Sequence, residues 1–113
     1  MLTLDSLRAW GADTAAGMNR CMNNEAFYLK MIGKALQDDS CEALKAAVES
    51  GDLARAFEIA HALKGVTGNL ALTPIDKPVR EITELLRSRT EMDYTALLTE
   101  IITKKNELTE LLR

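Results

Sequence analysis

The chain has 113 residues with a formal net charge of −3, and hydrophobic residues make up 47% of it while aromatic residues make up 4%. This length predicts one domain over residues 1–113, and the scarcity of aromatic residues beside many Ala, Leu and Met favours helices over sheets. The acidic balance argues against a nucleic-acid partner, and no stretch is apolar for long enough to span a membrane.

The amino-terminal part is predicted to form two short helices, within about 3–22. Residues 3–10 suit a short helix that ends at Gly11. Asp13 is a good N-cap for a second helix over about 14–22. The first residues show no basic segment leading into an apolar run, so we expect no signal peptide and a cytoplasmic protein.

A long helix is expected next. From residue 24 to residue 50 the apolar positions repeat at helical spacing without losing phase, which favours one helix bent at residues 38–40. The alternative is two helices, with Ser40 as the N-cap of the second.

Three further helices are predicted over about 53–72, 73–89 and 94–112. Long amphipathic helices joined by short loops pack as an antiparallel bundle. We therefore expect an all-α fold, an antiparallel four-helix bundle over about 24–112, preceded by the short amino-terminal helices.

The only histidine, His61, lies in the middle of the helix predicted over 53–72. Projection at about 100° per residue separates this helix into two faces. The predicted buried seam consists of Leu53, Ala56, Ala60, Leu63, Thr67 and Leu70. The predicted outward face carries His61 with Ala54, Phe57, Lys64, Gly65, Gly68 and Leu72.

The outward face suits phosphoryl transfer to an imidazole. A glycine inside a helix costs about 1 kcal/mol relative to alanine, so Gly65 needs a reason, and access of another protein to His61 is one. Lys64 is three residues from His61, with Cβ atoms about 5–6 Å apart on a helix, so its ammonium can meet a phosphate on the ring.

We therefore predict His61 as phospho-acceptor, Lys64 as the group that neutralises the phosphate, and Gly65 as the access residue. The remaining residues of this face are candidates for partner docking: Phe57, Ala54, Gly68 and Leu72.

Other chemistries fit the sequence less well. One histidine without a cluster of further ligands cannot fill a zinc shell, and nothing places Cys21 or Cys41 beside His61 as a nucleophile. No glycine-rich phosphate loop occurs. We therefore expect a phosphoryl carrier without its own ATP site, not an enzyme, and reduced cysteines.

Residues 60–70 (AHALKGVTGNL) resemble the signature of histidine-containing phosphotransfer (HPt) domains, in which lysine and glycine follow the histidine at i+3 and i+4. The segment 11–20 through 27–29 is also similar to that family. The resemblance covers roughly residues 11–112, and we expect a free-standing bacterial member of the family.

The resemblance implies a four-helix bundle in which a phosphohistidine forms on Nε2 of His61. It implies that the phosphoryl group moves between aspartates of receiver (response-regulator) domains, with a hybrid histidine kinase upstream. No stably bound cofactor is expected, and Mg²⁺ would come from the partner receiver domain during transfer. We also expect a monomer, and, from the charge and hydropathy given above, neither a nucleic-acid nor a membrane partner.

Two positions depart from the family pattern. Many members have glycine where Ala71 stands, and many have a glutamine on the facing helix that supports the histidine or its phosphate. Aligned without gaps, Thr83 takes the place of that glutamine, and Arg80 or Arg87 could substitute for it.

Two other functions stay open from the sequence. One is a helical adaptor that binds receiver domains without being phosphorylated. The other is the phospho-acceptor domain of a chemotaxis-type histidine kinase. The chain closes with a charged helix and has no ATP-site motif, so a free-standing protein is the simpler expectation.

Overall fold

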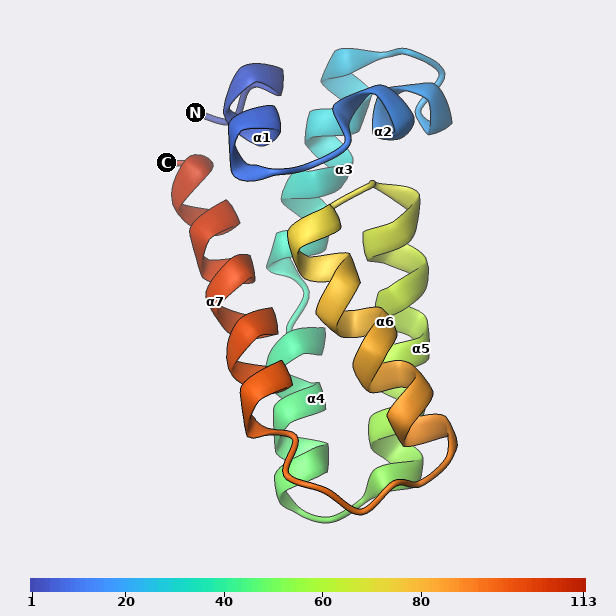
Figure 1. Ribbon diagram of the computed structural model, residues 1–113. Helices are drawn as coiled ribbons and strands as arrows, with labels where there is room; N and C mark the ends of the chain where they lie inside the picture. The colour runs from blue at the N-terminus through green and yellow to red at the C-terminus, as the bar shows by residue number, and fades with distance from the viewer.

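The computed structural model describes all residues, 1–113, and contains seven α-helices and no strands (Figure 1). The helices are α1 (Leu4–Trp10), α2 (Thr14–Arg20), α3 (Glu25–Gln37), α4 (Ser40–Glu49), α5 (Leu53–Asn69), α6 (Thr73–Arg87) and α7 (Thr95–Leu111). The predicted all-α class is confirmed. None of the seven helices has both the length and the apolar character needed to cross a membrane.

The helices pack as an elongated bundle with extents of 41 × 25 × 19 Å. In Figure 1, α3 and α4 follow each other end to end between α7 and α5, and together they occupy the place of one long helix. Helix α5 packs against α4 and α6, and α7 closes the bundle by contacting α6 and α4. The predicted four-helix bundle with two short additional helices is therefore confirmed.

Helices α1 and α2 cover one end of the bundle, where the two chain termini also meet (Figure 1). The amino group of Met1 donates a hydrogen bond to the carbonyl of Arg113. The predicted boundaries between the short helices are confirmed: α1 ends at Gly11, which has φ 122°, and Asp13 caps α2 by accepting a hydrogen bond from the N–H of Ala16.

The expectation of one continuous helix over 24–50 is wrong. Asp38 is extended (φ −74°, ψ 140°), and its carboxylate accepts hydrogen bonds from the backbone N–H and hydroxyl of Ser40 at 2.9 and 2.7 Å. A side-chain acceptor of this kind offers the backbone an alternative to helical hydrogen bonds, so the helix stops and restarts. Ser40 is the first residue of α4 and not its cap; Asp39 occupies the N-cap position.

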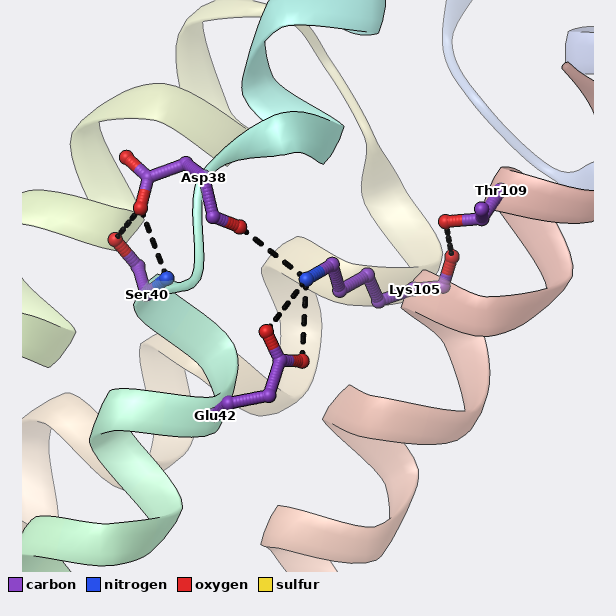
Figure 2. Close-up of polar contacts among 5 residues, drawn as sticks. All are labelled: Asp38, Ser40, Glu42, Lys105 and Thr109. Carbon is purple, nitrogen blue, oxygen red and sulfur yellow. Dashed lines mark hydrogen bonds and ion pairs between the residues drawn. The ribbon is translucent and has the colours of Figure 1, made fainter.

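Lys105 of α7 holds this break in place (Figure 2). Its ammonium donates to the carbonyl of Asp38 at 3.2 Å and to both carboxylate oxygens of Glu42 at 2.7 and 3.1 Å. The α3–α4 junction is thus tied to the neighbouring helix α7.

The core explains how α5 is oriented. Its seam residues Ala56, Ala60, Leu63, Thr67 and Leu70 are all buried, as predicted, and Leu53 is half-buried. Burial of apolar surface contributes roughly 25 cal/mol per Å², so this seam fixes the rotation of α5 about its axis. The opposite face of the helix is consequently directed away from the core.

Candidate functional site: the exposed face of helix α5

His61 is exposed in the middle of α5, between residues whose side chains lie in the core. Ala60 is fully buried and Leu63 is 9% exposed. Within the chain, neither nitrogen of the His61 ring takes part in a hydrogen bond. The imidazole is therefore open to a reaction partner while the backbone beneath it is anchored.

The ring of Phe57 stacks on the ring of His61. The two centroids are 5.7 Å apart and the planes differ by 5°. Phe57 is itself half-buried, and two guanidinium groups from the end of α6 lie over its ring: that of Arg87 at 5.1 Å and that of Arg89 at 5.5 Å from the centroid. The predicted docking residue thus belongs to a stack that includes the histidine.

Arg89 reaches this stack because the chain turns sharply at the end of α6. Arg89 has φ 53°, in the left-handed region that usually favours glycine. The N–H of Thr90 bonds to the carbonyl of Leu85, and the N–H of Arg89 bonds to that of Leu86, both at 3.0 Å. These two bonds form the Schellman pattern of a helix end.

Sequence reasoning named Arg87 as a substitute for the family glutamine but missed Arg89. A signal existed in the antiparallel pairing of α5 with α6, which places the start of one helix beside the end of the other. The left-handed turn that directs Arg89 towards α5 has no such signal, because neither a glycine nor an asparagine marks it.

Lys64 and Gly65 lie one helical turn beyond His61. Lys64 is half-buried and makes no ion pair within the chain, so its ammonium is available to an incoming anion. Gly65 is exposed, and a Cβ atom placed there would have nothing within 4 Å. The space beside the imidazole on this side is therefore empty.

Gly68 differs from Gly65. A Cβ atom at Gly68 would lie 3.4 Å from the guanidinium of Arg80 and 3.5 Å from the carboxylate of Asp76. Those two side chains form an ion pair at 2.6 Å, and Asp76 also accepts a hydrogen bond from the hydroxyl of Thr67 at 2.8 Å. Gly68 thus gives room to neighbouring side chains of the same molecule. Ala54, the other small residue predicted for docking, is exposed.

Two predicted site residues are placed elsewhere by the structure. Leu72 is 2% exposed and belongs to the core, so it cannot line an open docking face. Thr83 is fully buried, and its hydroxyl donates to the carbonyl of Val79 at 2.6 Å, so it cannot support His61 as the family glutamine would. Arg80, named with it, is engaged by Asp76.

A comparison with protein families matches residues 31–113, which include the whole of α5 and its histidine, to the Hpt domain. The chain belongs to the Hpt domain family. Hpt domains are phosphoryl carriers, and they interact with receiver domains and kinases in the phosphorelays of two-component systems. The resemblance stated from the sequence is confirmed, and with it a general phosphotransfer role. No curated protein and no solved structure matches the chain.

Proposed function

We propose that this Hpt protein is a phosphorelay intermediate that accepts a phosphoryl group on His61 from the aspartate of a receiver domain, or from a histidine kinase, and passes it to the aspartate of another receiver domain. The observation that carries the proposal is the exposure of His61. It is the only histidine of a phosphotransfer domain, and its ring stands on the open face of α5.

The chain itself has to supply only a nucleophilic ring nitrogen in the right position. A ring nitrogen of His61 attacks the phosphorus, the N–P bond forms, and the O–P bond to the aspartyl carboxylate breaks with the carboxylate as leaving group. Passing the group onward reverses these bond changes at a second receiver. Phosphoryl transfer depends mainly on positioning and on neutralising charge.

Lys64 supplies part of that neutralisation. A phosphoryl group brings roughly −1.5 to −2 charge at neutral pH, by analogy with other phosphorylated side chains. An exposed ion pair contributes about 0.2–1 kcal/mol, and the contribution grows when a docked partner excludes water. The partner would provide the remaining positive charge, including Mg²⁺. Because the partner also supplies the phosphoryl group, the carrier needs no ATP site of its own.

The test is transfer of label from a panel of receiver domains phosphorylated on their aspartates. Wild type should acquire an acid-labile, base-stable label and return it to an unlabelled receiver. The variant His61→Gln should acquire none while retaining the helical circular dichroism spectrum of wild type.

Equal labelling of both proteins would refute His61 as the acceptor. A wild-type protein that binds receiver domains and never acquires label would instead be an adaptor. Lys64→Met, compared with Lys77→Met at an exposed site on α6, should slow transfer without removing the label.

A further inference from the structure

Phe57 and the two arginines above it form a stack that ends on the imidazole of His61. We propose that Phe57 is a positioning residue: its ring fixes the orientation of the His61 ring, and Arg87 and Arg89 in turn hold the ring of Phe57. This inference deepens the proposed function, since an oriented ring presents its nitrogen along the line of phosphoryl transfer.

The ring of His61 has one neighbour that can fix its orientation, the ring of Phe57. The terminal torsion of a histidine side chain is broad, so an exposed ring without hydrogen bonds turns freely. The ring of His61 has no hydrogen bond but has an aromatic neighbour one turn earlier on the same face, at 5.7 Å and nearly parallel. Centroid separations of 4.5–7 Å are those of attractive aromatic pairs.

The ring of Phe57 is itself restrained by two guanidinium groups. A guanidinium group within about 6 Å of a ring centroid is attracted to the face of that ring. Both guanidinium groups over Phe57 meet this condition and are tethered themselves: Arg87 pairs with Glu84 at 3.2 Å, and Arg89 donates to the carbonyl of Leu86 at 2.7 Å. The end of α6 therefore restrains a ring that belongs to α5.

The backbone of Arg89 adopts a left-handed conformation. A helix end of this type is formed with least strain by glycine, yet the chain has arginine there, at φ 53°. An arginine in this conformation brings a cation over Phe57 that glycine would not supply. The guanidinium group over Phe57 is thus supplied from a position where the backbone itself is strained.

Nuclear magnetic resonance can test the orientation directly, because His61 gives the only imidazole signals of the chain. We expect Phe57→Leu to average the side-chain couplings of His61, whereas Phe57→Tyr should restore the wild-type couplings. Phe27→Leu, at the exposed phenylalanine of α3, is the matched control and should leave the His61 signals unchanged.

Reactivity is the second measurement, with phosphoramidate as a small donor. Its P–N bond breaks, the phosphoryl group moves to a ring nitrogen of His61, and ammonia is released. A misplacement of 1 Å can cost about 100-fold in rate, so we expect the smaller disturbance in Phe57→Leu to slow this reaction by about 10-fold. Phe57→Tyr should recover the rate.

A docking role for Phe57 predicts a different result, and that result would overturn the proposal: slower transfer from receiver domains with unchanged His61 couplings and an unchanged phosphoramidate rate. The couplings are measured without any phosphoryl donor. They therefore decide the positioning role even if His61 proves not to be the acceptor, and the two proposals can fail separately.

Arg89→Gly separates positioning from stability. Glycine removes the backbone strain of the left-handed conformation, so we expect the melting temperature to rise. The same substitution removes the guanidinium group over Phe57, so we expect the His61 couplings to become averaged. Asn23 is an exposed residue with a similar backbone conformation (φ 54°), far from the stack. Asn23→Gly removes the same kind of backbone strain, and it should raise stability without changing the His61 couplings. Unaltered His61 couplings in Arg89→Gly would remove Arg89 from the proposal.

Discussion

At the residue scale, the two glycines on the His61 face have different surroundings. Gly65 faces empty space, whereas Gly68 accommodates the ion pair of Arg80 with Asp76. Both were predicted for this face from helical spacing, which gives the direction of a residue but not what fills the space around it. Only Gly65 meets the requirement for an access residue.

Gly65→Gln should therefore raise stability and impair transfer in the same protein. Glutamine gains about 0.5–1 kcal/mol over glycine in a helix, and nothing in the chain obstructs its side chain. The added bulk stands beside the imidazole, so transfer from a receiver domain should fall by about 10-fold or more, a loss of about 1.4 kcal/mol or more in transition-state stabilisation.

The control for this prediction is Gly33→Gln in α3, where a Cβ atom also has nothing within 4 Å. It should give the same gain in urea unfolding without slowing transfer. If Gly65→Gln transferred at the wild-type rate, access would not be the function of Gly65.

Residues beyond the end of α5 show where sequence reasoning failed. The seam and the exposure of His61 were predictable because helical periodicity fixes both. Leu72 was misplaced because the helix ends at Asn69 and Ala71 adopts φ 55°, so a projection at constant angle no longer holds. Thr83 was misplaced because its short hydroxyl bonds to its own helix, which only the packed structure reveals.

At the element scale, the spacing of apolar residues did not predict the break between α3 and α4, and the reason is geometric. Helix α4 continues in line with α3 between the same neighbouring helices, so the apolar stripe keeps its phase across the junction (Figure 1). The local sequence Asp38-Asp39-Ser40 marked the position of the break. It could not show that Lys105, distant in sequence, stabilises it (Figure 2).

Lys105→Met should loosen this junction. The side chain of Lys105 is 12% exposed, and its loss leaves the carbonyl of Asp38 and the carboxylate of Glu42 without their partner. Charge-assisted hydrogen bonds contribute about 1.5–3 kcal/mol, but Glu42 is 51% exposed and water replaces part of the interaction. We expect a loss of about 1 kcal/mol in urea unfolding.

Lys104→Met is the matched control for this element. Lys104 makes an exposed pair with Glu107 at 3.3 Å, so its loss should cost less than about 0.5 kcal/mol. Hydrogen exchange at the end of α3 and the start of α4 should accelerate only in Lys105→Met. Equal effects of the two variants would mean that Lys105 acts as an ordinary surface lysine.

At the scale of the whole molecule, Tyr28 joins the α1–α2 end of the protein to the bundle. It is a fully buried residue of α3, and its hydroxyl donates to the carbonyl of Leu70, just after α5, at 2.8 Å. Its ring lies so close to Gly17 of α2 that a Cβ atom there would be 2.4 Å away. One phenol therefore connects α2, α3 and the end of α5.

This phenol should make stability depend on pH in the alkaline range. Burial, followed by the charges of Cys21 and Asp13, raises the pKa of Tyr28 from 10.0 to about 12, against the opposing effect of Arg20. The unfolded chain then releases the phenol proton at lower pH than the folded chain does. The contribution of Tyr28 is thus complete below pH 10 and is lost as the pH rises through about 12.

Tyr28→Phe isolates this contribution. The variant should be less stable than wild type at pH 8 by about 1–2 kcal/mol, because the carbonyl of Leu70 loses its donor. The difference should shrink between pH 10 and 12, since the wild type alone loses the contribution of this phenol there. Tyr94→Phe, at the other buried tyrosine, keeps Tyr28 intact and should retain the decline that Tyr28 causes. A constant difference between wild type and Tyr28→Phe from pH 8 to 12 would show that ionisation of this residue is not linked to unfolding.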